Sequence, residues 1–190
     1  MNTNCKMIYA SPLGEMLLLA DGKGLRGAWF VDQDKYYASY LPIIQEAELL
    51  DDPCVFNVPD TDELPAVSVL KDATKWLDQY FSGVEPTAAV PLHLQGTDFQ
   101  QEVWTLLQTI PYGTTVTYGD LAKRLASKRG CARMAAQAVG GAVGRNPVSI
   151  IVPCHRVIGS SGSLTGYAGG IERKAALLKL EGVEVAKEAI

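Results

Sequence analysis

The sequence has few of the residues that form disulfides and metal sites, with two histidines and four cysteines among 190 residues. The cysteines are widely spaced and form no CxxC pair, so we expect free thiols in a reducing compartment. The start of the chain lacks the basic stretch and apolar run of a secretory signal. No apolar run is long enough to span a membrane. These absences predict a cytoplasmic protein with no membrane partner.

Metal and cofactor sites also lack their usual ligands. Cys5 and His93 could begin a structural zinc site, but Cys54 is the one spare ligand and no others are evident. The glycine pairs of the second half do not have the spacing of a phosphate-binding loop. We therefore expect no metal and no cofactor.

The net charge of −4 is small but unevenly distributed. Residues 1–96 hold 6 basic and 14 acidic residues, a balance of −8, whereas residues 97–190 hold 11 and 7, a balance of +4. A polyanion would therefore dock on the second half of the chain. A balance of this size is equally typical of an ordinary solvated surface.

The first half has the pattern of a small antiparallel sheet with a helix. Short apolar segments separated by turn compositions predict strands at 6–10, 15–20 and 25–31. Apolar residues at helical spacing predict a helix over 66–81. Residues 33–65 are interpreted as a loop with a short helix, and 90–94 as one more strand. With Gly96 as the hinge, we expect a strand-rich domain at 1–96.

The second half is mainly helical, and we expect a second domain at 97–190. Helical spacing and end signals predict helices at 99–109, about 117–126, 132–143 and 172–181, with a short apolar strand at 149–152. The two middle helices have the form of a helix-turn-helix. The second of them is dominated by small side chains, which offer few donors to base edges. This pattern favours DNA binding in the minor groove with little sequence preference, and equally a tightly packed alanine-rich helix.

The chemistry of the chain is concentrated at Pro153-Cys154-His155-Arg156. A thiolate is a strong nucleophile, and an imidazole beside it can accept the thiol proton. Taken alone, a Cys-His pair is more typical of a buried, inert cysteine beside a surface histidine.

A longer string around this pair resembles the O6-alkylguanine-DNA alkyltransferase family, the methylated-DNA–protein-cysteine methyltransferases. It consists of Gly144-Arg145-Asn146-Pro147, Pro153-Cys154-His155-Arg156-Val157, Gly166-Tyr167-Ala168-Gly169-Gly170 and the run from Lys174 to Glu181. The resemblance covers 97–190 well, and the first half only in length, position and strand-rich character. It implies a small ribonuclease-H-like α/β domain followed by a mostly helical domain with a helix-turn-helix.

The resemblance also implies the activity. Cys154 accepts an alkyl group from the O6 of a flipped guanine in double-stranded DNA, irreversibly and once per protein, with O4-alkylthymine as a further candidate substrate. The protein is expected to act as a monomer. His155 draws the thiol proton through a water toward Glu181. Asn146 braces the turn before the active-site strand, and Tyr118 crowds the phosphate of the target nucleotide and protonates the departing guanine.

Two further groups of residues follow from the resemblance. The wall of the base pocket is assigned to the backbone around 164–168 and to Ser149, Leu164, Tyr167, Ala168 and Lys174. DNA contacts are assigned to Lys123, Arg124, Lys128, Arg129, Arg133, Ala135, Gln137, Ala138 and Arg156. Gln137 stands where the family usually carries an arginine that fills the gap left by the flipped base. We expect glutamine to fill that space without supplying a charge.

Two other classes of function compete with this interpretation. A Cys-His hydrolase would need an oxyanion hole and would regenerate its cysteine. A lesion-binding protein without catalysis is the other alternative, but related binding-only proteins lack the cysteine at this position. The joint presence of Cys154, His155, Asn146, Tyr118 and Glu181 favours catalysis.

Overall fold

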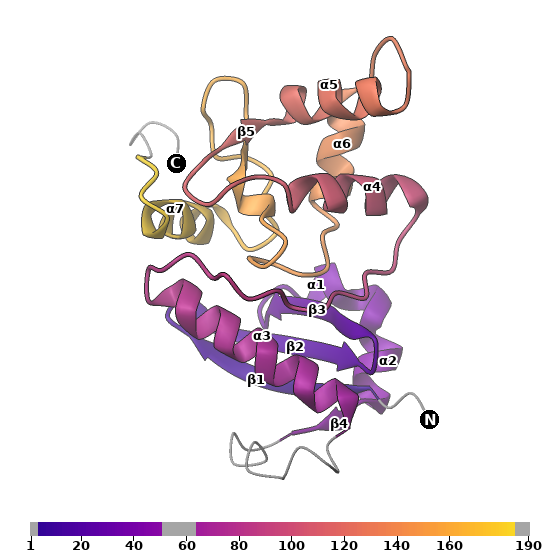
Figure 1. Cartoon of the computed structure of the whole chain (residues 1–190), viewed down its shortest axis with the longest axis vertical. Helices are drawn as coiled ribbons and strands as arrows, with labels where there is room; N and C mark the ends of the chain where they lie inside the picture. Colours follow the sequence, from indigo (N-terminus) through magenta and orange to yellow (C-terminus); the bar gives the residue numbers. More distant parts are fainter. Residues whose placement is uncertain (1–3, 51–63, 185–190) are drawn as a thin grey trace. The chain divides into compact units, whose positions relative to one another are not determined.

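The structure is a computed structural model that describes residues 4–50 and 64–184 (Figure 1). The chain forms two compact units, Met1–Gln95 and Gly96–Ile190. The elements of the first unit are β1 (Cys5–Ser11), β2 (Gly14–Asp21), β3 (Gly24–Phe30), α1 (Asp34–Tyr37), a 3-10 helix (Ala38–Tyr40), α2 (Leu41–Glu46), β4 (Glu48–Leu49) and α3 (Pro65–Phe81). Those of the second are α4 (Asp98–Leu107), β5 (Val116–Thr117), α5 (Tyr118–Lys128), α6 (Ala136–Val143), a 3-10 helix (Cys154–Arg156), β6 (Val157–Ile158) and α7 (Ile171–Leu180).

The sheet of the first unit confirms the three expected strands. Strand β2 pairs antiparallel with β1 and with β3, and β4 adds parallel to β1. Within the described ranges the strand order is therefore β3-β2-β1-β4. The carboxylate of Asp21 closes the β2–β3 turn by accepting from the backbone N–H groups of Lys23 and Gly24. An aspartate that bonds backbone two and three residues ahead is a common way to build such a turn.

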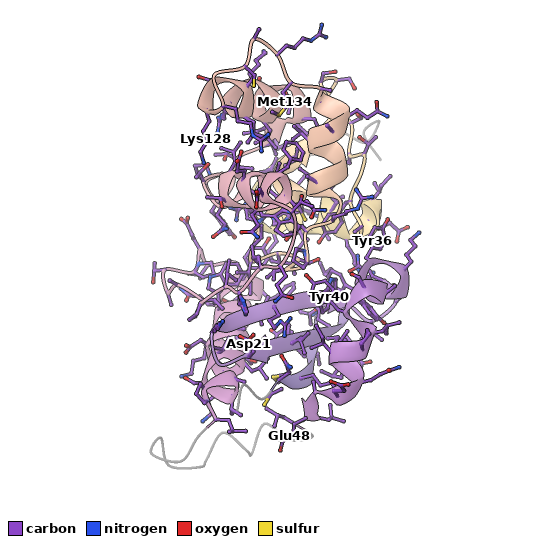
Figure 2. The ribbon with its side chains drawn as sticks, turned by 90° about the vertical axis from the view of Figure 1, so that its right-hand side faces the viewer. Asp21, Tyr36, Tyr40, Glu48, Lys128 and Met134 are labelled. Atoms are coloured by element: carbon purple, nitrogen blue, oxygen red, sulfur yellow. The ribbon has the colours of Figure 1, made fainter. Side chains whose placement is uncertain are left out.

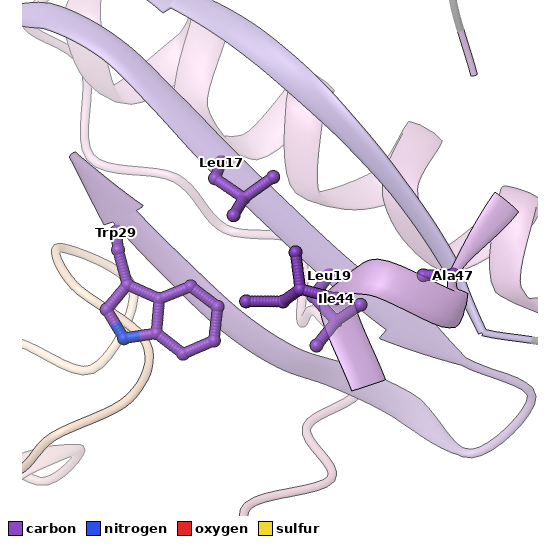
Figure 3. Close-up of a cluster of buried hydrophobic side chains, with 5 residues drawn as sticks. All are labelled: Leu17, Leu19, Trp29, Ile44 and Ala47. Carbon is purple, nitrogen blue, oxygen red and sulfur yellow. The ribbon is translucent and has the colours of Figure 1, made fainter. Parts of the chain in front are cut away.

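Helix α3 covers one face of this sheet, as its apolar spacing predicts (Figure 1). The Tyr9 hydroxyl of β1 donates to Asp78 of α3 at 2.8 Å. The other face carries a cluster of buried side chains that comprises Leu17, Leu19, Trp29, Ile44 and Ala47 (Figure 3). Burial of apolar side chains on both faces is the main favourable contribution to this fold.

Two expectations for the first unit are corrected. Residues 90–94 form no strand but a single parallel bridge between Leu25 and Leu92. Pro91 within that segment has no N–H to extend a ladder. Residues 33–50 hold helical turns and β4 rather than a loop with one short helix, and the rest of the expected loop, 51–63, lies outside the described residues.

The two residues considered for zinc have other surroundings. His93 Nδ1 lies 2.7 Å from a carboxylate oxygen of the buried Asp21, and Arg26 lies 3.8 Å from the same oxygen. Cys5 is fully buried in β1. In the part of the chain that the structure describes, no three His, Cys, Asp or Glu residues are grouped as a metal site would need. Cys54 lies outside those residues.

The helix starts of the second unit follow from capping residues. Thr97 and Thr117 each accept from the backbone N–H three residues ahead, and the side chains of Gln100 and Asp120 bond back to the capping residue. These are capping boxes, which satisfy N–H groups that a helix start leaves unpaired.

None of the helices in the described ranges combines the length and the apolar character that a membrane-spanning segment needs.

The end of α5 is a Schellman motif. Gly130 has φ +65°, its N–H donates to Ser127, and the N–H of Cys131 donates to Ala126. The chain then stays non-helical until Ala136, so the expected start of the next helix at 132 is four residues too early. The alanine-rich sequence contains no side-chain cap that would mark the start. Helices α5 and α6 are the expected helix-turn-helix pair, with a longer connection.

The segment before Cys154 differs most from expectation. Residues 149–152 form tight turns rather than a strand, and Ile150 has φ +71°. The strand comes after the cysteine, where β6 pairs parallel with β5. This pairing places the start of α5 beside the segment that follows Cys154.

Candidate active site

Cys154 begins a 3-10 helix and is 7% exposed. The Asn146 side chain donates from Nδ2 to Cys154 Sγ at 3.1 Å. The same nitrogen lies 3.1 Å from the carbonyl oxygen of Val148 and 2.8 Å from that of Val152. Asn146 therefore bonds the turn and the sulfur together.

The thiol pKa of Cys154 is raised, because burial disfavours the thiolate. The hydrogen bond from Asn146 and the charge of Lys174 act in the opposite direction. In the resting site the sulfur is therefore mainly a thiol, and a base is needed to take its proton.

His155, next in the chain, is fully buried, and its Nε2 lies 2.7 Å from Glu181 Oε1. Burial lowers the pKa of His155 despite the nearby carboxylate, so the ring is neutral at pH 7. Burial alone would raise the pKa of Glu181, but its contacts with His155 and Arg156 outweigh burial and hold the pKa at about 2. An ionised carboxylate can only accept, so His155 carries its proton on Nε2 and its lone pair on Nδ1.

Glu181 caps the C-terminal end of α7 and is held from several sides. Arg156 donates to both carboxylate oxygens, from Nε at 2.9 and 3.2 Å and from Nη2 at 3.0 Å. The backbone N–H of Gly113 donates to Oε2 at 3.0 Å. Arg156 also donates to the carbonyl oxygen of Ile110. A buried carboxylate with this many donors is fixed in place and can orient His155.

The surroundings of Arg156 correct one expectation. The residue is 7% exposed, and its guanidinium is bound to Glu181 and Ile110. A phosphate contact would require breaking this buried ion pair, which is costly. Arg156 belongs to the internal support of the site rather than to a DNA-binding surface.

Tyr118 and Lys174 meet at one backbone carbonyl. The Tyr118 hydroxyl donates to the Thr165 oxygen at 3.0 Å, and the Lys174 ammonium donates to the same oxygen at 2.9 Å and to that of Val157. Burial lowers the pKa of the fully buried Lys174 to about 8 and raises that of Tyr118 to about 12. Tyr118 therefore ties the loop 159–166 to the start of α5, and Lys174 ties the same loop to α7.

The residues assigned to the base pocket lie around this loop and the cysteine. Leu164, Tyr167 and Ser149 are buried, and Ala168 is half-buried. The rings of Tyr167 and His155 make an edge contact with centroids 6.5 Å apart. The second unit thus brings together the residues assigned to the pocket and to the catalytic group. A thiol, a neutral imidazole on a fixed carboxylate, and a tyrosine hydroxyl suit transfer of a group to sulfur.

Comparison with known proteins identifies the family. The ribonuclease-like domain of 6-O-methylguanine DNA methyltransferase matches residues 5–94, and its DNA-binding domain matches residues 98–183. The chain belongs to the 6-O-methylguanine DNA methyltransferase family.

Individual relatives agree. The methylated-DNA–protein-cysteine methyltransferase of Methanosarcina acetivorans is 40% identical over 175 residues, 92% of this chain and 96% of the relative. The crystal structure of a Mycobacterium tuberculosis O6-methylguanine methyltransferase is 41% identical, with a TM-score of 0.71 over 94% of this chain and 93% of that one. M. tuberculosis OGT in complex with DNA is 41% identical, with a TM-score of 0.70 over 93% and 91% of the chains.

In this methyltransferase chain, the residues assigned to DNA contact, Arg156 apart, lie on α5, on α6 and on the connection between them. Lys128 ends α5 and Met134 lies in the connection (Figure 2). The side chains of the assigned residues other than Arg156 are exposed: Lys123, Arg124, Lys128, Arg129, Arg133, Ala135, Gln137 and Ala138. A cavity of about 510 Å³ lies between α5 and the connection, and Lys123, Arg133 and Ala135 are among its lining residues.

Arg129 differs from the other assigned cations. Its Nε donates to Glu102 of α4 at 2.8 Å, and its guanidinium lies 5.2 Å from the centre of the Phe99 ring. An exposed ion pair of this kind is weak, so it leaves Arg129 able to exchange Glu102 for a phosphate.

Some residues of the methyltransferase site were missed from the sequence. The N–H of Gly113 and the carbonyl of Val152 are backbone groups, and side-chain patterns contain no signal for them. The sequence also contains no sign of the conformation of Gly166, which has φ +75° and where a Cβ would lie 2.6 Å from the Tyr118 hydroxyl. The glycine therefore permits the close approach of Tyr118 to this loop.

Proposed function

We propose that this chain repairs DNA by transferring an alkyl group from the O6 of guanine to Cys154, once per protein molecule. The observation that carries the proposal is the arrangement of Cys154, Asn146, His155 and Glu181 in a chain of this family. We further propose that it acts as a monomer on double-stranded DNA, with O4-alkylthymine as a second candidate substrate.

The proposed reaction is a displacement at carbon. His155, polarised by Glu181, takes the thiol proton of Cys154 through a water. The thiolate attacks the alkyl carbon, the S–C bond forms, and the C–O6 bond breaks with its electron pair passing to the guanine. The guanine then takes a proton, which we assign to Tyr118. Because that hydroxyl donates to Thr165 in the structure, it must turn toward the base when the base enters.

A base inside a duplex cannot reach the sulfur of Cys154, a residue that is only 7% exposed. The nucleotide must therefore leave the stack, as in other enzymes that act on a base. We propose that α6 is the element that meets the DNA and that Gln137 fills the gap left by the flipped base. The small, exposed side chains of Ala135 and Ala138 beside it favour close approach.

A count of turnovers tests the proposal. The protein is mixed with an excess of duplex that carries one O6-methylguanine, and guanine regained is measured by nucleoside chromatography. We expect one guanine per protein and none with Cys154→Ser. Many turnovers per protein would favour a hydrolase, and tight binding without any transfer would favour a lesion-binding protein.

The role of Gln137 has its own test. We expect Gln137→Ala to slow transfer by about tenfold, because nothing then fills the gap in the duplex, a loss of roughly 1.4 kcal/mol. Single-turnover kinetics on the same duplex measure it, with the exposed Gln101→Ala of α4 as control. An unchanged rate and an unchanged DNA affinity would remove Gln137 from this role.

A further inference from the structure

Ile150 is the one non-glycine residue with a positive φ within the described ranges 4–50 and 64–184. Its φ is +71°, and its side chain is fully buried. The N–H of Ile151 donates to the carbonyl oxygen of Ser149 at 2.9 Å, which closes a γ-turn with Ile150 at its centre. The γ-turn with a positive central φ is the rare, strained form. A β-branched residue in this conformation is a clear outlier.

A second tight turn follows directly. The N–H of Cys154 donates to the carbonyl oxygen of Val152 at 2.8 Å, around Pro153 with φ −81° and ψ 62°. This is the common, unstrained form of the γ-turn, which suits proline. The N–H of Val152 donates to the carbonyl oxygen of Val148 at 3.1 Å. Residues 148–154 are thereby folded back so that the carbonyls of Val148 and Val152 both reach Asn146.

The side-chain amide nitrogen of Asn146 has more hydrogen-bond acceptors around it than protons to donate. Its NH₂ group carries two protons, yet Nδ2 lies near the carbonyl oxygens of Val148 and Val152 and near the sulfur of Cys154. The hydrogen bond to sulfur therefore depends on where the two carbonyls hold the amide. Because that bond favours the thiolate, the turn around Ile150 bears on the reactivity of Cys154.

We propose that Ile150 is a positioning residue for Cys154, whose strained turn sets the place of the Asn146 amide beneath the sulfur. The proposal rests on the proposed role of Cys154 as the alkyl acceptor. A strained residue persists only where its surroundings over-determine it. Here the buried side chains of Val148, Ile150 and Val152 anchor the segment in the core of the second unit.

Substitutions at Ile150 separate conformation from packing. Ile150→Val keeps the β-branch and most of the buried volume. Ile150→Ala loses the packing but still disfavours a positive φ. Ile150→Gly loses slightly more packing but adopts a positive φ freely. If only packing mattered, the glycine variant would be no better than the alanine variant. If the turn positions the sulfur, the glycine variant regains the transfer rate and the thiol pKa that the alanine variant loses.

Three readouts on the full chain test this ranking. They are the single-turnover rate on a duplex with one O6-methylguanine, the affinity for undamaged duplex, and the pH profile of Cys154 alkylation by iodoacetamide. We expect Ile150→Val to match the wild type. We expect Ile150→Ala to be about tenfold slower, equivalent to roughly 1.4 kcal/mol of barrier, with a higher thiol pKa and unchanged DNA affinity. We expect Ile150→Gly to regain most of the rate and of the pKa.

A glycine variant as slow as or slower than the alanine variant would overturn the proposal, as would an alanine variant with wild-type rate and thiol pKa. If Ile150→Ala does not fold, Ile150→Gly decides alone: a rate and thiol pKa near those of wild type support the turn, and losses in both contradict it. The wild-type control separates the two proposals. If wild-type Cys154 takes no methyl group, the proposed function fails, and the iodoacetamide profiles still test the turn.

Discussion

At the residue scale, Glu181 is the charged centre of the site. Glu181→Gln would leave the guanidinium of Arg156 buried without its counter-charge. We expect a loss of about 3–5 kcal/mol in the free energy of unfolding, as for other buried pairs broken on one side. Urea denaturation measures it. Glu172→Gln, exposed on the same helix, is the control and is expected to change stability by less than about 0.5 kcal/mol.

The low pKa of Glu181 also sets the acidic pH range in which this residue ceases to stabilise the fold. The carboxyl pKa is about 2 in the folded protein against an ordinary 4.5, so the unfolded chain binds more protons between these values. The contribution of Glu181 to stability is therefore complete above about pH 4.5 and is lost as the pH falls toward about 2. A Glu181→Gln variant that loses stability with acid as steeply as the wild type would contradict this assignment.

Lys174 should affect the stability of the fold at alkaline pH. Its pKa is about 8 in the folded protein and 10.5 ordinarily, because burial disfavours the ammonium. Between these values the unfolded chain binds more protons, so this residue makes stability rise with pH across that window. We expect Lys174→Met to remove that rise and the exposed Lys179→Met to keep it, in urea unfolding at pH 8 and 10. Equal slopes for the wild type and Lys174→Met would show that Lys174 does not titrate in this range.

At the element scale, Gly130 holds the end of α5. Its φ of +65° is unfavourable for any residue with a Cβ, although no atom lies within 4 Å of the place that a Cβ would take. We expect Gly130→Ala to cost about 1 kcal/mol through backbone conformation alone. Gly119→Ala, inside the same helix and without a positive φ, is the matched control and should stabilise by up to about 1 kcal/mol. Thermal unfolding of both variants provides the measurement, and a neutral Gly130→Ala would contradict the Schellman end.

The elements differ in how far the sequence predicts them. The starts of α4 and α5 are predictable because Thr97 and Thr117 cap them with their own side chains. The start of α6 is not, because Ala135 has no side chain that could cap it. The apolar run 149–152 looks like a strand, but its hydrogen bonds go to its own turns and to Asn146. That pattern depends on tertiary packing, which periodicity does not contain.

The same contrast applies to the site. A short motif places Cys154 and His155 side by side, and resemblance alone brings in Asn146, Glu181 and Tyr118. Arg156 is buried and paired with Glu181. The sequence could not predict this, because most arginines are exposed and an adjacent histidine does not indicate burial. Backbone donors and acceptors such as Gly113 and Val152 become visible only once the chain is folded.

At the scale of the whole molecule, charge and chemistry are divided between the two units. Residues 1–96 carry the balance of −8, whereas residues 97–190 carry the balance of +4, the cysteine and the helix-turn-helix. The second unit is thus the part suited to a polyanion. The first unit supplies a separate core built on both faces of one sheet.

The most direct test of alkyl transfer to Cys154 is mass spectrometry of the intact protein and its peptides after mixing with a duplex that holds one O6-methylguanine. We expect one added methyl group per protein, on the peptide that contains Cys154, and we expect the adduct to persist after the DNA is removed. An unmodified protein that has restored the guanine, or a methyl group on another residue, would contradict transfer to Cys154.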